Sequence, residues 1–595
     1  MINRKIFCGA LTIVPTLLCA AESERLNVIV ILTDDVGYGD VSYTGNPYIQ
    51  TPAMQELYSE SICFDNFHTG TTSAPTRSGL MTGVDGNRTG VWHTIAGRSL
   101  LDLDLYTLGD LFKDNGYATA MYGKWHLGDN YPYRPCDRGF DDVLCLKGGG
   151  IGQLPDYWGN TYFDDTYYRD RDIPEPQTGY CTDIFTNEAI RFATENSDNP
   201  FFVYLAYNSA HAPFNVEASY SDPYKEMDGV GNPMICGMIT NIDDNIARLR
   251  ASLKEQGLDK NTVIVLFGDN GPNNVKLLKE SFADTTYSYN GGLRGKKSMA
   301  WEGGHRQAML MHIPGEGEVR IDNELAMVYD ILPTLANLCG IEPKCDREFD
   351  GVDILSSQSR AGRIGVVDTQ RQELLREGAT SAVLMDDWRL IDRKKLYNIA
   401  KDREQRVDVA KSHPDIVEKL AAEYDQWWSY VSEDEDVRHP IYLATDVKGE
   451  SVLFTSHDLH TMNGKMPVWN QGSARRNVNT DGFWSVYAPK SGKYDFELYR
   501  WSPFTGLNLD QEAPKGRSIP NSTKVAPKGV AITNMKSATI YIDGVEVASV
   551  SDFPTDQQSV SLPNIKLSEG YHELRAEITN TEGKSYPVWF VRCTK

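Results

Sequence analysis

The sequence predicts an α/β fold with a mainly parallel central sheet flanked by helices, a small C-terminal α+β subdomain and an additional C-terminal β-sandwich. From residue 26 to about 340, short apolar runs alternate with helical stretches, which is typical of a parallel sheet covered on both faces. Between about 365 and 432 strand-like runs precede one amphipathic segment. Beyond it helical periodicity largely vanishes, and short strand-like runs separated by turn residues indicate an antiparallel sandwich.

Four apolar runs are the clearest strands of the first domain, because short β-branched runs are typical of buried parallel strands. They are Asn27–Leu32, Ala118–Tyr122, Phe201–Tyr207 and Thr262–Phe267. Two helices are expected at Leu108–Asn115 and Met238–Gln256. The glycine-rich stretch 148–152 is expected in a long aromatic-rich loop that runs to about Pro174, and long loops in compact domains tend to be functional.

The C-terminal third is predicted to contain two further units. Ser381–Ile391 is expected to form strands and Pro414–Tyr430 an amphipathic helix, and the acidic segment 433–436 is expected to be a linker. The sandwich strands are expected at Ser451–Thr455, Gly482–Ala488, Lys493–Arg500, Ala538–Val550, Ser559–Leu567 and Tyr571–Ile578. The predicted division is a signal peptide at 1–21, a catalytic α/β domain at 22–362, an α+β subdomain at 363–432 and a β-sandwich at 433–595.

Charge and the N-terminus limit the function classes. The formal net charge of −23 argues against a nucleic-acid partner, which needs a basic surface. Arg4 and Lys5 precede the apolar stretch Ile6–Leu18 and two small residues, as in a secretion signal. That stretch is too short to span a bilayer, and no other segment is long and apolar enough. We therefore expect a periplasmic, extracellular or cell-surface protein, with a lipoprotein anchor at Cys19 as an alternative.

Polar residues follow each of the four predicted strands of the first domain. If these strands are parallel, their carboxyl ends share one edge of the sheet, where α/β proteins bind ligands. Carboxylate and amide oxygens at that edge could hold a divalent cation such as calcium. A structural role is the alternative for any one residue, but four strand ends with the same chemistry favour a common site. The residues are Asp34 and Asp35, Gly123 to His126, Asn208 to His211, and Asp269 and Asn270.

The segment Thr71 to Gly83 predicts a helix whose entrance favours an anion. Pro75 suits a first helical turn, where its missing N–H costs nothing. Ser73 would then lie at the helix entrance, beside free backbone N–H groups and the positive end of the helix dipole. Arg77 would project from the first turn. The alternative is that Ser73 simply caps the helix.

The run Ser73-Ala74-Pro75-Thr76-Arg77 resembles the signature of the type I sulfatases, of the alkaline phosphatase superfamily. The resemblance covers residues 25 to about 430 and implies an alkaline phosphatase-like fold. Further segments match in order: Leu32 to Asp35, Leu80 to Gly83, Gly123 to Gly128, Phe267 to Gly271, Gly292 to Lys297, Trp301 to Gly304, Asp330 to Thr334, and Leu396 to Asn398.

The resemblance implies a specific chemistry. A formylglycine-generating maturation enzyme would convert Ser73 to formylglycine (3-oxoalanine), and one hydroxyl of its gem-diol would attack the sulfur of a sulfate ester. Calcium would assist, since a divalent ion offsets the sulfate charge. The implied calcium ligands are Asp34, Asp35, Asp269, Asn270 and the modified Ser73.

The other implied roles belong to basic residues. Arg77 would hold the formylglycine region, while Lys124 and Lys297 would bind sulfate oxygens. His211 would protonate the leaving oxygen, and His126 would deprotonate the second hydroxyl to expel sulfate. The chain departs from the family pattern in two places. Lys296 is an alternative to the adjacent Lys297, and His305-Arg306 follows the Glu302-Gly303-Gly304 segment, where we expect His305 at the surface or behind the site.

A sulfated glycan is the expected substrate, because a secretion signal and a β-rich appendage suggest an extracellular polymer. Aromatic residues of the 148–174 loop, Trp158 among them, and Trp92-His93 are candidates for sugar contact, with ordinary loop packing as the alternative. The predicted substrate-binding residues are Lys124, His211, Lys297, His93 and Trp158. A phosphomonoester or phosphonate hydrolase of the same superfamily is an alternative, as is a non-catalytic glycan-binding protein if Ser73 stays unmodified. The serine-type signature indicates a bacterial source.

Overall fold

The computed structural model describes residues 25–595 except 274–288, 357–359, 361, 370–378, 433–436, 463–464 and 523–524. The predicted signal peptide, Cys19 and the acidic linker at 433–436 lie outside the described residues. Among the helices that are described, none has both the length and the apolar composition needed to cross a bilayer. The eight cysteines after residue 24, all of them described, are free thiols.

An eleven-stranded central sheet forms the middle of the α/β unit that the sequence predicts to be catalytic. Its five inner strands, β8-β1-β7-β3-β4, are all parallel, and antiparallel pairs join β9, β5 and β6 to them. The mainly parallel sheet is confirmed. In spatial order the strands are β10 (Arg320–Asp322), β2 (Ile62–His68), β9 (Arg306–His312), β8 (Thr262–Gly268), β1 (Asn27–Thr33), β7 (Phe201–Ala206), β3 (Ala118–Lys124), β4 (Asp142–Leu146), β5 (Thr166–Arg169) and β6 (Ile173–Pro176), with β11 (Ala326–Met327) paired to β2.

Helices cover both faces of this sheet because alternate side chains of each strand point to opposite sides. In β1, Val28, Val30 and Leu32 join one buried core, whereas Ile29 and Ile31 join the other. The first core is covered by α2 (Ser73–Thr82), α3 (Leu108–Asp114) and α8 (Ile331–Leu338). The second is covered by α1 (Pro52–Ser59), α4 (Cys181–Glu195) and α6 (Pro233–Glu255). Short helices α5 (Ala218–Ser221) and α7 (Glu302–His305) connect other elements.

The register of the inner strands aligns their carboxyl ends. Thr33 of β1 pairs with Gly268 of β8, and Leu32 pairs with Ala206 of β7. Ala206 in turn pairs with Gly123 of β3. The residues that follow β1, β7 and β8, and the last residues of β3, therefore emerge at one edge of the sheet, as the sequence predicts.

Some predicted boundaries are wrong. Strand β3 continues through Lys124, and α6 begins at Pro233, five residues before the prediction. The 148–174 stretch is not one loop, because β5 pairs with β4 and β6 and extends the sheet. The run Ala538–Val550 is a hairpin of two strands rather than one, β21 (Met535–Ile542) and β22 (Val545–Ser551).

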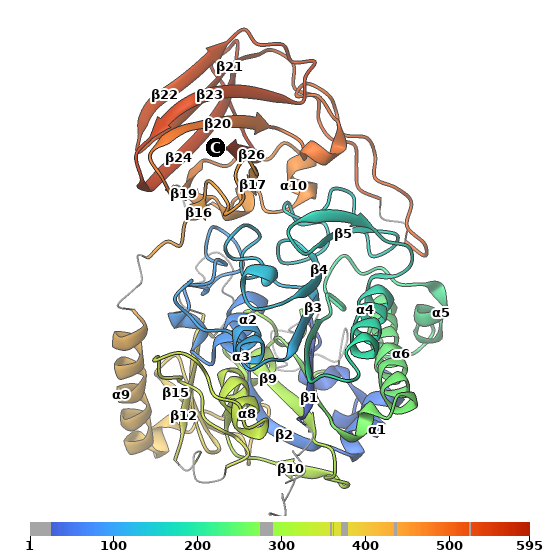
Figure 1. Cartoon of the computed structure of the whole chain (residues 1–595). Helices are drawn as coiled ribbons and strands as arrows, with labels where there is room; N and C mark the ends of the chain where they lie inside the picture. The colour runs from blue at the N-terminus through green and yellow to red at the C-terminus, as the bar shows by residue number, and fades with distance from the viewer. Residues whose placement is uncertain are drawn as a thin grey trace, which may run out of the picture.

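Two further β units follow, and Figure 1 shows the last of them at one end of the molecule, next to β4 and β5. A four-stranded antiparallel sheet, β12 (Ile364–Asp368), β13 (Ser381–Met385), β14 (Trp388–Ile391) and β15 (Lys395–Asn398), packs against α9 (Pro414–Val431). The remaining strands form two sheets around one shared core, which we call the C-terminal sandwich. Trp484 is buried in this core, whereas Trp501 and Trp589 are buried in a smaller cluster that includes Leu154.

The first sandwich sheet has β16 (Ile441–Tyr442), β19 (Gly482–Ala488), β24 (Gly570–Asn580), β21 and β22 in order, with β18 (His460–Thr461) and β25 (Ser585–Pro587) at its margins. The second has β17 (Val452–Thr455), β26 (Phe590–Thr594), β20 (Gly492–Tyr499) and β23 (Ser559–Leu567). A short helix, α10 (Gln471–Arg475), lies between β18 and β19 in sequence.

Candidate active site

Three carboxylates meet at the aligned strand ends. Asp34 and Asp35 follow β1, Asp269 follows β8, and oxygens of all three lie within 4.8 Å of one another. All three side chains are buried. Asp35 has a φ of 58°, a left-handed conformation that aspartate tolerates better than most residues. Its amide donates to Asp269 Oδ1 at 3.1 Å, which fixes the turn after β1 against the turn after β8.

Helix α2 brings Ser73 to this cluster. The hydroxyl of Ser73 donates to Asp34 Oδ1 at 3.1 Å and lies 3.4 Å from Asn270 Oδ1. Thr72, not Ser73, occupies the position before the helix, so the capping alternative is wrong. Thr76, one turn further on, donates to the Asp269 carbonyl at 2.6 Å. The helix entrance is thus tied directly to the end of β8.

Each carboxylate has its own cation. Arg77 Nη2 lies 2.9 Å from Asp269 Oδ2, and Lys124 Nζ lies 2.7 Å from Asp34 Oδ2. Lys297 Nζ lies 2.5 Å from Asp35 Oδ1. Lys297 rather than its neighbour Lys296 is the lysine that reaches the cluster.

The electrostatics keep two of the acids ionised. Burial raises the pKa of Asp34, but Lys124 and His211 outweigh it and hold the pKa well below its usual range. Burial also opposes ionisation of Asp35, yet Lys297 keeps its pKa below the usual value. Burial and the charge of Asp34 raise the pKa of Asp269 to about 6, although Arg77 opposes them. The cluster is therefore a dense set of anionic oxygens in a buried setting.

These residues fit a calcium ion. Calcium prefers oxygen ligands from carboxylates, amides and hydroxyls, and the donors here are three carboxylates, the Asn270 amide and the Ser73 hydroxyl. Asp35 Oδ2 is buried and has no hydrogen-bond partner among the described residues, which leaves a ligand oxygen available. A bound calcium ion would supply Lewis-acid charge at this point.

Two predicted histidines lie next to the cluster in different ways. His211 Nδ1 bonds the Ala212 carbonyl at 2.7 Å, and its Nε2 lies 3.9 Å from Asp35 Oδ2. The His211 side chain is 16% exposed and that of Lys297 is 14% exposed, which places both toward the solvent side of the cluster. His126 is buried and its Nε2 bonds the Thr94 carbonyl at 2.9 Å, while its Nδ1 has no partner in the part of the chain that the structure describes.

His93 and Trp158 are not brought into the cluster by any contact among the described residues. His93 Nδ1 accepts from the Thr94 amide at 2.8 Å, and its buried Nε2 has no partner. Trp158 packs against Trp501, with ring centroids 5.7 Å apart, and Arg475 lies over its ring. Their roles in substrate binding stay predictions.

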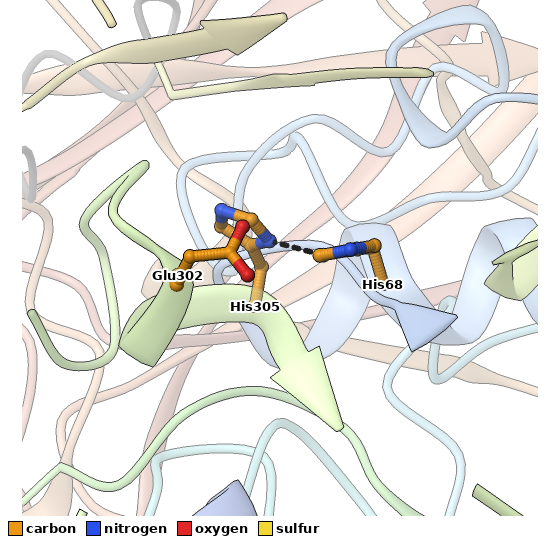
Figure 2. A group of neighbouring side chains, drawn as sticks. All are labelled: His68, Glu302 and His305. Atoms are coloured by element: carbon orange, nitrogen blue, oxygen red, sulfur yellow. Dashed lines mark hydrogen bonds between the residues drawn. The ribbon is translucent and has the colours of Figure 1, made fainter. Parts of the chain in front are cut away.

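A second group of metal-ligand side chains, His68, Glu302 and His305, lies apart from the cluster and is buried. Figure 2 shows the two imidazoles facing each other, with Glu302 beside them. Their Nδ1 atoms are 2.9 Å apart. His305 is buried, so of the two expected positions, at the surface or behind the site, the surface is excluded.

This second group is not suited to a metal ion. Glu302 is paired at 2.6 Å with Arg389 and at 2.9 Å with Arg306, so an added cation would meet two guanidinium groups. Both histidine rings are hydrogen-bonded at each nitrogen, although the bond from His305 to the Ala300 carbonyl is long at 3.4 Å. A satisfied hydrogen-bond network is the better account of these residues.

Sequence reasoning missed Tyr204 as a supporting residue, whereas it named Asn208 as a strand-end residue. Tyr204 of β7 accepts a bond of 3.3 Å from Arg77, and Asn208 presents a buried oxygen that no described residue bonds. Asn208 lies two residues past the end of β7, which is at Ala206. In the glycine-rich stretch, a Cβ on Gly149 would lie 2.3 Å from the His126 ring, and one on Gly150 would lie 3.0 Å from His211. These glycines let the loop cover both histidines.

Comparisons with known proteins agree with this geometry. The family model described as Sulfatase matches residues 26–341. Arylsulfatase J of Mus musculus is 27% identical over 475 residues, covering 68% of this chain and 76% of that protein. N-acetylgalactosamine-6-sulfatase of Mus musculus is 27% identical over 373 residues, covering 57% of this chain and 67% of that protein.

A solved structure, Ps i-CgsB in complex with k-i-k-neocarrahexaose, is 26% identical with a TM-score of 0.60, and the match covers 68% of this chain and 93% of that chain. The matched family model, these relatives and the strand-end cluster lead to one conclusion: the chain belongs to the sulfatase family, as a type I sulfatase that acts as a sulfuric ester hydrolase.

Proposed function

We propose that this protein is an exported, calcium-dependent sulfatase that removes sulfate from a sulfated carbohydrate after Ser73 is converted to formylglycine. The contacts of the Ser73 side chain are the main support for this proposal. One side chain lies within hydrogen-bond distance of a carboxylate of the cluster, Asp34, and of a buried lysine, Lys124, at 3.1 Å in each case. A nucleophile at residue 73 would thus lie between anionic oxygens suited to calcium and a cation suited to sulfate.

The hydrated aldehyde of a formylglycine would supply an attacking hydroxyl and a second hydroxyl that permits release of sulfate by elimination. In this proposal Arg77 keeps Asp269 in place through its 2.9 Å ion pair. Lys124 and Lys297 bind sulfate oxygens as negative charge develops, since preorganised cations in buried sites are strong transition-state stabilisers. Both ammonium groups already face the carboxylate cluster.

The two histidines divide the proton transfers. His211 presents Nε2 on the more exposed side, where a leaving-group oxygen would arrive, and its Nδ1 is committed to a backbone carbonyl. We propose the imidazolium form of His211, which carries a proton on Nε2 as well, as the general acid. His126 has its Nε2 committed to Thr94, which leaves the buried Nδ1 as a lone-pair acceptor. We propose it as the base that acts on the second hydroxyl.

The carbohydrate assignment is supported by relatives rather than by the cluster itself. Ps i-CgsB is described in complex with a neocarrahexaose, and another relative is named N-acetylgalactosamine-6-sulfatase. We propose His93 and Trp158 as residues on the sugar side. Export rests on the N-terminal pattern of residues 1–21, and maturation requires a formylglycine-generating enzyme as a partner.

The test measures hydrolysis by the full chain, co-expressed with a serine-type maturation enzyme. Sulfate release is followed from an aryl sulfate, the matching aryl phosphate and phosphonate, and a panel of defined sulfated saccharides. We expect the sulfate ester to react at least about 10²-fold faster than the phosphorus esters, a difference of about 2.7 kcal/mol in barrier. Faster phosphorus ester hydrolysis would favour the alternative hydrolase, and binding of glycans without turnover would favour a non-catalytic role.

A further inference from the structure

The C-terminal sandwich reaches the catalytic unit through His457. This residue belongs to a single 3-10 turn, η10 (Ser456–Asp458), and its side chain is completely buried. Its Nε2 lies 3.2 Å from Gln153 Oε1 in the glycine-rich stretch of the catalytic unit. Its ring centroid lies 6.4 Å from that of His126. A sandwich residue is therefore a near neighbour of a proposed catalytic base.

Hydrogen-bond partners determine the protonation of His457. The amide of Gly149 donates to Gln153 Oε1 at 2.7 Å, so this atom must be the oxygen of Gln153. His457 Nε2 must then carry a proton to bond it. His457 Nδ1 faces Asp458 Oδ1 at 3.0 Å and needs a proton as well. The imidazole is therefore a cation, in agreement with a pKa that burial would lower but that Asp458 raises above its usual value.

Two supports hold the ring of His126, and both are anchored on His457. The first is Gly149, whose backbone packs against the ring and which is tied to His457 through Gln153. The second is the Thr94 carbonyl, which bonds His126 Nε2. Thr94 lies two residues before Ala96, whose amide donates to the His457 carbonyl at 2.8 Å. One sandwich residue thus fixes both the face and one nitrogen of the His126 ring.

The same stretch has further sandwich contacts. The Leu154 amide donates to the Trp469 carbonyl at 2.8 Å, and Gln471 Nε2 donates to the Gln153 carbonyl at 3.0 Å. These two hydrogen bonds hold Gln153 where His457 can reach it. The sandwich is therefore built into the surroundings of the site.

We propose that His457 is a positioning residue, by which the C-terminal sandwich holds His126 with its Nδ1 free to accept a proton. This inference rests on the proposed function of His126 and extends it to a part of the chain that the sulfatase family model does not match. The sandwich is then part of the catalytic unit and not only an appendage. Removal of the hydrogen bond between His457 and Gln153, which we call the Gln153 bridge, should slow the chemical step without weakening substrate binding.

The test compares two variants of similar size. His457→Gln places an amide N–H near the position of Nε2 and keeps the bond to Gln153. His457→Asn places its amide near the position of Nδ1 and loses that bond. We expect His457→Asn to lower kcat by about 10- to 100-fold, as for other residues that orient a catalytic group. His457→Gln should stay within about threefold of wild type, less than 1 kcal/mol in barrier, and KM should change little in both.

The control is Tyr133→Phe, which removes another buried bond between the catalytic unit and the sandwich, from the Tyr133 hydroxyl to the Pro440 carbonyl at 2.8 Å. Its kcat should match wild type. If His457→Asn does not fold, Gln153→Leu removes the acceptor from the other side and should give the same loss of kcat. Equal kcat in His457→Asn, His457→Gln and Tyr133→Phe would overturn the proposal.

Amide hydrogen exchange gives a readout that does not need activity. Peptides covering residues 148–154 should exchange faster in His457→Asn than in His457→Gln, because the Gly149 amide bonds Gln153 Oε1 and local opening exposes it. Equal exchange in the two variants would contradict the bridge. If the wild-type chain turned over no sulfate ester, that result would count against the proposed function. The exchange result would still show whether the hydrogen bond between His457 and Gln153 holds the 148–154 stretch.

Discussion

Lys124 and Asp34 form an ion pair with 2.7 Å between Nζ and Oδ2, and both side chains are buried although 90 positions separate them. The same Lys124 ammonium lies 3.1 Å from the Ser73 hydroxyl. Three proposed roles therefore meet at one point. Ser73 is the residue proposed for modification, Asp34 is proposed to hold calcium and Lys124 is proposed to bind sulfate. Changes at any of them should alter turnover, each with its own signature.

Ser73 should be the residue on which turnover depends. Ser73→Ala should lower kcat by roughly 10³-fold or more, as loss of a nucleophile does in other hydrolases. Mass spectrometry of the wild-type peptide containing residue 73 should give a mass lower than the serine form by two hydrogens. Protein made without the maturation enzyme is the control and should show the serine mass and little activity. Full activity with an unmodified Ser73 would refute the formylglycine assignment.

Asp269 should matter for metal retention. Asp269→Asn keeps the shape but removes the charge that pairs with Arg77, so we expect less bound calcium by elemental analysis. Calcium at about 100 times its Kd should stabilise the wild type by about 2.7 kcal/mol and the variant by much less. Asp243→Asn is the matched control, since Asp243 is a buried carboxylate that bonds the amides of Ala53 and Met54. Equal calcium content in all three proteins would contradict the site.

The adjacent lysines 296 and 297 should behave differently. Lys297→Ala removes the cation 2.5 Å from Asp35 and should lower kcat by about 10²- to 10³-fold, the usual loss for a preorganised transition-state contact. Lys296→Ala is the control and should stay within about threefold of wild type. Steady-state kinetics with an aryl sulfate measure both. A large loss of kcat in Lys296→Ala and a small one in Lys297→Ala would mean that Lys296 is the lysine that binds sulfate.

The loss of activity in His211→Ala should depend on the leaving group of the substrate. General-acid assistance is worth about 10²- to 10⁴-fold and matters most when the departing oxygen is strongly basic. His211→Ala should therefore cost much more with a sugar sulfate than with an activated aryl sulfate. The ratio of kcat/KM between the two substrates is the measurement. A uniform loss across the series would argue for substrate binding in place of proton transfer.

Glu302 should stabilise the fold in a pH-dependent way. Burial opposes its ionisation, but Arg389 and other neighbouring cations hold its pKa well below the usual range. Glu302→Gln would remove the carboxylate paired with Arg389 and one of the two carboxylates paired with Arg306, and we expect a loss of about 3–5 kcal/mol in the free energy of unfolding near neutral pH.

The sign of the pH effect follows from the lowered pKa of Glu302. Its contribution is complete above the unfolded value of about 4.3 and disappears as the pH falls toward the folded value. The difference from wild type should be constant between about pH 6 and 8 and shrink below about pH 4. Denaturant titrations measure it. The control is Glu195, an exposed glutamate paired with Arg191. Glu195→Gln should lower the free energy of unfolding by less than about 1 kcal/mol. If the difference between wild type and Glu302→Gln grew on acidification, the assignment would be contradicted.

The cluster of acidic and basic residues was predictable because its members obey local rules. Buried parallel strands are visible as β-branched runs, and their carboxyl ends must share an edge. Asp34, Asp35, Asp269 and Asn270 could thus be placed together without coordinates. Lys297 could be chosen only by resemblance, since two adjacent lysines look alike in sequence and just one of them reaches Asp35.

The sequence by itself determined which strands end in polar residues, the helix that begins near Ser73 and the sandwich character of the C-terminal region. Tertiary structure alone decided which distant groups touch, because contacts such as His457 with Gln153, 304 positions apart, depend on how separately folded layers pack. The burial of His305 and the packing of Trp158 against Trp501 are of the same kind. Local patterns specify which side of a strand is apolar, but packing between units sets the neighbours of each side chain.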